Sequence, residues 1–95
     1  MEKVGVSFYS TLTTEELKAK FIQPLRATIE RDHTGIYSNH LRQIDPEESG
    51  TVEHLLIFEV HDFKEGLRVL RLELSKLGDL AEFRFHNLNP SEPSY

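Results

Sequence analysis

The chain opens with a strict alternation of apolar and small or polar residues. Apolar side chains occupy every second position from Val4 to Phe8, and this period of two predicts a strand with one buried side. Thr13 and Glu16 follow at the spacing of a capping box. We therefore expect a helix that begins at about Thr14.

Apolar residues then recur at helical spacing from Leu17 to Ile29, which predicts one helix face packed on a sheet. Pro24 lies inside this pattern. Because proline lacks a backbone N–H and crowds the preceding turn, we expect a kink or break near Gln23. Glycine and polar residues at 32–35 predict the end of the helix.

The middle of the chain reads as a hairpin. Residues 36–44 alternate weakly and carry several polar side chains, which predicts an edge strand. Residues 45–50 are acidic and rich in turn formers, so they predict the connecting loop. Residues 51–60 contain the most hydrophobic stretch, Leu55 to Phe58, which favours a central strand.

A second helix and a last strand complete the pattern. Asp62 stands three residues before Glu65 and opens an apolar stripe that lasts until Gly78, so we expect a helix between them. Residues 81–86 alternate again and predict a strand with Phe83 and Phe85 inward. Residues 1–88 form a single domain in this interpretation, and 89–95 form a flexible C-terminal tail.

The element order is therefore strand, helix, strand, strand, helix, strand. This order predicts an α+β domain of the ferredoxin-like βαββαβ type. Right-handed crossovers place both helices on one face of a four-stranded antiparallel sheet and leave the other face open.

Composition narrows the classes of function. Sixteen acidic and eleven basic residues give a formal charge of −5, which disfavours nucleic acid as a partner. The chain has no cysteine, so disulfides and thiolate metal sites are excluded and a reducing, cytoplasmic location is expected. No apolar stretch has signal-peptide or membrane-spanning length, which disfavours secretion and membrane insertion.

The open side of the predicted sheet carries the candidate binding residues. In the third strand, Val52, His54, Leu56, Phe58 and Val60 form the more apolar set, so they should face the helices. The expected binding surface on the other side consists of Ser7, Tyr9, Leu55, Ile57, Glu59, Arg84 and His86. An apolar centre within a polar rim is typical of a recognition patch.

The second strand can be read with either face inward. Placing Tyr37 and Leu41 inward exposes Ser38, His40 and Arg42 on the open side.

Three functions are consistent with the sequence, and the first two use this surface. The pattern favours a non-catalytic module that pairs with itself or with another protein. The alternative is a small enzyme whose cavity forms when two sheets dimerise, with Tyr9, Glu59, Arg84 and His86 as catalytic candidates. A weaker alternative is an acidic inhibitor of a basic protein, which would use the net charge and residues 45–49.

We expect neither a metal nor a cofactor. The five histidines show no ligand spacing on a strand or a helix, and no thiolate assists them. His54 differs from the other four because its alternation places it on the buried side, where it needs a hydrogen-bond partner.

Overall fold

A computed structural model describes residues 1–44, 52–78 and 80–89. The strands are β1 (Glu2–Ser10), β2 (Gly35–Ile44), β3 (Val52–Val60) and β4 (Arg84–Asn87). The helical elements are α1 (Thr14–Leu17), the π turn η1 (Lys18–Ile22), α2 (Gln23–Arg31), α3 (Phe63–Leu77) and the 3₁₀ turn η2 (Leu80–Glu82). The predicted loop at 45–50 and tail residues 90–95 lie outside the described residues.

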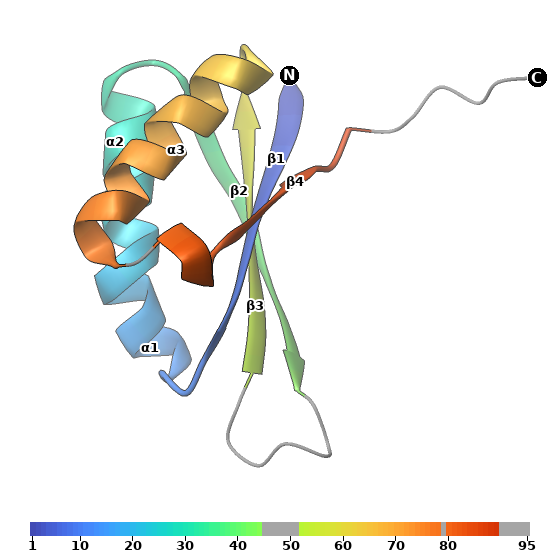
Figure 1. The fold of residues 1–95 in the computed structure, drawn as a ribbon. Coiled ribbons are helices and arrows are strands. Elements are labelled where there is room, and N and C mark those ends of the chain that lie inside the picture. Colours follow the sequence, from blue (N-terminus) through green and yellow to red (C-terminus); the bar gives the residue numbers. More distant parts are fainter. Residues whose placement is uncertain (45–51, 79, 90–95) are drawn as a thin grey trace, which may run out of the picture.

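The strands form one antiparallel sheet in the order β2-β3-β1-β4. Both helical segments cover the same face of this sheet, and the other face carries no helix (Figure 1). The predicted α+β class, with a four-stranded antiparallel sheet and two helices, is confirmed. β1 and β3 are the central strands, and the apolar run of β3 predicted the central place of that strand.

The first helical segment begins as the sequence indicates. The Thr13 side chain accepts the Glu16 N–H, and the Glu16 carboxylate accepts the Thr13 N–H, which completes the capping box. The expected disruption near Gln23 takes the form of the wider turn η1, closed by the Gln23 N–H on the Lys18 carbonyl. Pro24 then falls in the first turn of α2, directly after this wider turn.

The core lies between the sheet and the helices. On β3, every second residue from His54 to Val60 is buried, as predicted. These residues pack with three groups of buried side chains: Val4, Val6 and Phe8 of β1; Leu17, Leu25 and Ile29 of the first helical segment; and Leu70 and Leu74 of α3. The Phe8 ring also contacts the Phe21 and Phe83 rings, with centroids 5.0 and 5.3 Å away.

A β-bulge in β2 changes the predicted faces of this strand. Tyr37 pairs with Phe58, but the register then shifts so that Asn39 pairs with Ile57 and Leu41 with Leu55. Tyr37 therefore points inward as expected, whereas Leu41 points to the open side.

His40 and Arg42 correspondingly point toward the helices, which reverses their predicted exposure on the open side. The Arg42 guanidinium donates to the Thr14 hydroxyl at 3.0 Å, which confirms its direction. The extra residue of the bulge reverses the alternation of β2, and the side-chain pattern alone did not reveal it.

The last strand is shorter than the sequence predicted. Residues 80–82 form η2, and β4 begins only at Arg84. Phe83 is nevertheless buried. Asn89, assigned to the tail from the sequence, accepts the Lys3 N–H through its side-chain oxygen at 2.6 Å.

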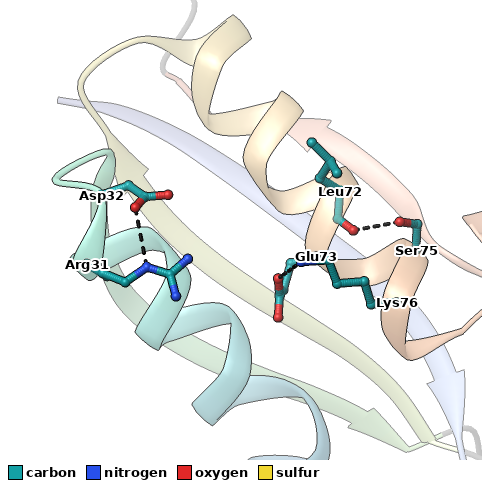
Figure 2. A network of polar contacts seen from close by, with 6 residues as sticks. All are labelled: Arg31, Asp32, Leu72, Glu73, Ser75 and Lys76. Atoms are coloured by element: carbon teal, nitrogen blue, oxygen red, sulfur yellow. Dashed lines mark hydrogen bonds and ion pairs between the residues drawn. The ribbon is translucent and has the colours of Figure 1, made fainter.

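The polar side-chain contacts within α3 and at the end of α2 join residues that are close in sequence. The Arg31 Nε donates to Asp32 at 3.4 Å, and the Ser75 hydroxyl donates to the Leu72 carbonyl at 2.6 Å. Figure 2 shows that each contact joins near neighbours at the end of α2 or within α3. Such solvated local contacts add little stability and assemble no site from distant segments.

Candidate functional site

We define the open face as the side of the sheet turned away from the helices. Its members follow from the strand register and from the burial of alternate residues on β3. They are Lys3, Gly5, Ser7 and Tyr9 of β1; Ile36, Asn39, Leu41 and Gln43 of β2; Glu53, Leu55, Ile57 and Glu59 of β3; and Arg84 and His86 of β4.

An apolar patch occupies the middle of this face. We define it as Leu41, Leu55, Ile57 and Leu88. Leu41 pairs directly with Leu55 across β2 and β3 and is 49% exposed. Leu55 and Ile57 are half-buried. Ile36, 46% exposed and paired with Glu59, extends the apolar surface toward one end of β2.

Leu88, which follows β4, covers part of β1 on the open face. The Leu88 N–H donates to the Lys3 carbonyl at 3.1 Å. A Cβ atom on Gly5 would lie 2.8 Å from Leu88 Cδ1 and 3.0 Å from Leu55 Cδ1. Glycine at this position lets the Leu88 side chain lie directly against the strand, and a larger residue would require the Leu88 and Leu55 side chains to shift. The residue after β4 thus completes the apolar patch and buries Gly5.

Charged side chains surround the patch. Glu53 and Glu59 lie at the two ends of the β3 row, outside Leu55 and Ile57. Lys3 pairs across the strands with Glu59, and Arg84 pairs with Ser7. Acidic groups therefore belong to β3 and basic groups to β1 and β4, so the two halves of the face carry opposite charge.

A serine and a histidine form the best-defined polar contact on this face. Ser7 Oγ lies 2.7 Å from His86 Nε2, and Ser7 is buried whereas His86 is half-buried. They line a hollow of about 90 Å³ together with Tyr9, Glu53 and Arg84. A hydroxyl bonded to an imidazole can act as a nucleophile with its base, although catalysis also needs a group that orients the ring.

The structure brings together three of the four catalytic candidates predicted from the sequence. Tyr9, Arg84 and His86 line the same hollow. Glu59 pairs with Lys3, six residues from Tyr9 along β1, which corresponds to about 20 Å of strand. Glu59 and Arg84 lie opposite different residues of β1, Lys3 and Ser7, and are not paired. Two carboxylates line the hollow in place of Glu59: Glu53, which pairs with Tyr9, and Glu82 of η2.

Sequence reasoning missed Leu41 and Leu88 as members of the patch. The bulge in β2 hid Leu41, because the alternation of side chains along the strand does not mark the extra residue. Leu88 lies beyond the last alternating residue, so no periodicity marks it. A better signal was Gly5, because an isolated glycine in a strand indicates close approach by another segment.

Within the described ranges, no cluster of three or more histidine, aspartate or glutamate side chains has the geometry to hold a metal ion. No helix in the same ranges is both long and apolar enough to span a bilayer.

Comparison with family models, curated proteins and solved structures gives no match to this chain. Its function must therefore be argued from the surface itself.

Proposed function

We propose that this chain is a non-catalytic self-association module of ferredoxin-like topology, which pairs with a second copy through the open face. The observation that carries this proposal is the apolar patch of Leu41, Leu55, Ile57 and Leu88, enclosed by charged residues. Four clustered, branched apolar side chains on one face are typical of a binding surface rather than of scattered exposure. The strand order supports the topology.

The charge distribution favours a second copy as the occupant. Homodimers most often form around a two-fold axis, so one surface must complement itself. An axis parallel to the central strands lays β3 of one copy over β1 of the other. Glu59 then faces Lys3 of the second copy, and Ile57 faces Leu88 of the second copy. Acidic and basic halves meet, and the apolar patches overlap.

The size of the face predicts a weak dimer. The rows from Glu53 to Glu59 extend about 20 Å along the strands, and four strands extend about 15 Å across. This area is smaller than the roughly 800 Å² that each partner buries in a standard interface. Association should therefore depend on concentration and persist only in a concentrated solution. Exposed pairs such as Glu59 with Lys3 contribute specificity more than affinity.

Replacement of Ile57 by aspartate tests the proposal. A carboxylate at the apolar centre loses its hydration when two faces close, so Ile57→Asp should abolish the dimer. Leu41→Asp makes the same test at a more exposed position, where the folded monomer tolerates a charge more readily. Sedimentation velocity over a hundredfold range of concentration measures association, and a melting curve for each variant verifies folding.

Leu72→Asp is the matched control. Leu72 lies on α3 and is 50% exposed, so it offers the same substitution on the helix side of the molecule. It should leave the dimer intact. A wild-type chain that stays monomeric up to millimolar concentration contradicts the proposal, as does equal loss of association in the control and the two open-face variants.

The Ser7–His86 contact supports a second candidate, a small hydrolytic enzyme whose hollow is enclosed when two sheets meet. Ser7 Oγ would attack an acyl carbon while His86 takes the hydroxyl proton and passes it to the leaving group, whose bond to that carbon breaks. Water would then hydrolyse the ester formed on Ser7 and release the acid. A fluorophosphonate probe measures this directly, because it labels an activated serine. Labelling that disappears in Ser7→Ala and His86→Gln would favour the enzyme, and its absence at concentrations where dimers form would exclude a serine nucleophile.

We propose a cytoplasmic, reducing compartment, supported by a chain of 95 residues that contains no cysteine. A fluorescent fusion examined by microscopy would test it, and recovery in a secreted or membrane fraction would contradict it.

A further inference from the structure

Two histidines distant in sequence, His40 and His54, contact each other on the helix side of the sheet. The bulge in β2 turns His40 toward the helices, and His54 is 1% exposed on the same side of β3. His40 Nε2 lies 3.0 Å from His54 Nδ1, within hydrogen-bond distance. Their ring centroids are 5.2 Å apart, and the Phe8 ring lies 5.6 Å from that of His54.

This contact limits the protons that the pair can hold. One of the two nitrogens must donate a proton, and the other must accept it with a lone pair. The remaining ring nitrogen of His54, Nε2, is buried and has no hydrogen-bond partner among the described residues. A charged His54 would carry an N–H at this position without an acceptor. Charging both rings would also remove the accepting lone pair and break the contact.

The surroundings of the pair oppose additional charge. Burial lowers the pKa of His40, and the cations Arg42 of β2 and Lys18 of η1 lower it further. Burial also lowers the pKa of His54, and His40 and Arg42 add to this effect. From β1 the pair meets the uncharged Phe8 ring. The bond from Arg42 to Thr14 of α1 holds the guanidinium on this side of the sheet.

We propose that His40 and His54 form a pH-sensitive contact that fastens the edge strand β2 to β3 at neutral pH and loosens it in acid. Among the residues that the structure describes, β2 has β3 as its single neighbour in the sheet, so this contact supplements the strand pairing that holds it. The proposal concerns the helix side of the sheet and does not depend on self-association through the open face.

The direction of the pH dependence follows from linkage. Both histidines stay neutral in the folded chain at a pH where they already bind protons in the unfolded chain. Protonation of the unfolded chain begins near the ordinary histidine pKa of about 6.5. The contact therefore contributes its full stabilisation above that pH, and the contribution is lost progressively as the pH falls toward the lower pKa values of the folded state.

Hydrogen exchange of the β2 amides tests the proposal. After correction for the intrinsic exchange rate, protection of residues 36–44 should fall about tenfold or more between pH 7.5 and pH 5.5. His40→Gln removes a titrating ring and should reduce this dependence. His61→Gln is the matched control, because His61 is exposed and lies outside the pair, and it should retain the wild-type dependence. The proposal fails if protection in β2 is independent of pH, or if His40→Gln and His61→Gln behave alike.

Two further measurements guard against a variant that does not fold. His54→Phe places an uncharged ring beside Phe8 and should also reduce the pH dependence. In the wild-type chain, NMR titration of the five histidine rings requires no substitution. The rings of His40 and His54 should titrate below the ordinary histidine pKa, and their transitions should coincide with shifts of the β2 amides. Titration of both rings near the ordinary pKa would overturn the proposal.

Discussion

At the scale of single residues, Asp62 shows how a local signal in the sequence becomes a structural contact. Its side chain accepts the Glu65 N–H at 3.0 Å, immediately before α3. The carboxylate thus satisfies one of the N–H groups that a helix start leaves without a partner. All the atoms involved lie within four residues, so the contact could be predicted without knowledge of the fold.

Asp62→Ala should lower the free energy of unfolding by about 1 kcal/mol, because it removes this cap. Chemical denaturation monitored by circular dichroism measures the change. Asp62→Asn is the control, since asparagine caps helices about as well and should retain most of the stability. Equal stability of the alanine variant and the wild type would show that the cap contributes nothing.

His54 marks the limit of residue-level prediction. Its alternation correctly placed it on the buried side and indicated that it needs a partner. The partner, His40, is fourteen residues away, and its direction depends on a bulge that shifts the register between Tyr37 and Asn39. Side-chain identity carries no clear signal for such an insertion, so the pair could be found only in three dimensions.

At the scale of elements, α3 meets β3 through a glycine that has no apparent role in the sequence. A Cβ atom on Gly66 would lie 2.6 to 2.8 Å from side-chain atoms of Val60, which is fully buried. The glycine therefore allows the first turn of α3 to approach the end of β3. Helix propensity alone would favour alanine here.

Gly66→Ala should destabilise the domain by roughly 1 kcal/mol, because overpacking outweighs the gain in helix propensity. Gly78→Ala is the control. Gly78 has an extended backbone, and its nearest neighbours are Phe83 ring atoms 3.7 and 3.8 Å away. Gly78→Ala should change the free energy of unfolding by less than about 0.5 kcal/mol. Thermal melts of both variants measure the difference, and a more stable Gly66→Ala would refute the packing argument.

Elements were predictable where a local pattern determines them. The capping box of Thr13 and Glu16 and the apolar run of β3 gave boundaries close to those observed. The alternation at residues 81–86 predicted a longer strand than β4. Phe83, which follows the turn η2, is buried although it is not part of a strand. A buried aromatic ring can belong to a strand or to a turn, so an inward-facing aromatic residue alone does not establish the backbone conformation.

At the scale of the whole molecule, layering separates two kinds of surface. The helix side buries the aromatic and aliphatic core together with the histidine pair, whereas the opposite side presents the apolar patch and its charged rim. The α+β class followed from the order of periodic segments. The membership of the patch did not, since Leu88 joins it through a contact with Gly5 that is distant in sequence.

Zinc should produce no saturable, one-to-one stabilisation of the chain. The described residues contain no cluster of three or more potential ligands, and His40 and His54 bond to each other across their facing nitrogens. Melting curves with increasing zinc concentration measure the effect. A stoichiometric rise in melting temperature that disappears in His40→Gln would show that the pair accepts a metal.

The bulge in β2 separates the length of this strand from the faces that its side chains occupy. Deleting Ser38 would remove the extra residue and make the pairing continuous, with Asn39 still opposite Ile57 and Leu41 still opposite Leu55. The apolar surface and the imidazole contact would both keep their present sides of the sheet. One codon could thus be gained or lost at this point without turning the rest of the strand over. Within such a fold, a bulge in an edge strand is a place where evolution can change the length of the chain and preserve its binding surface.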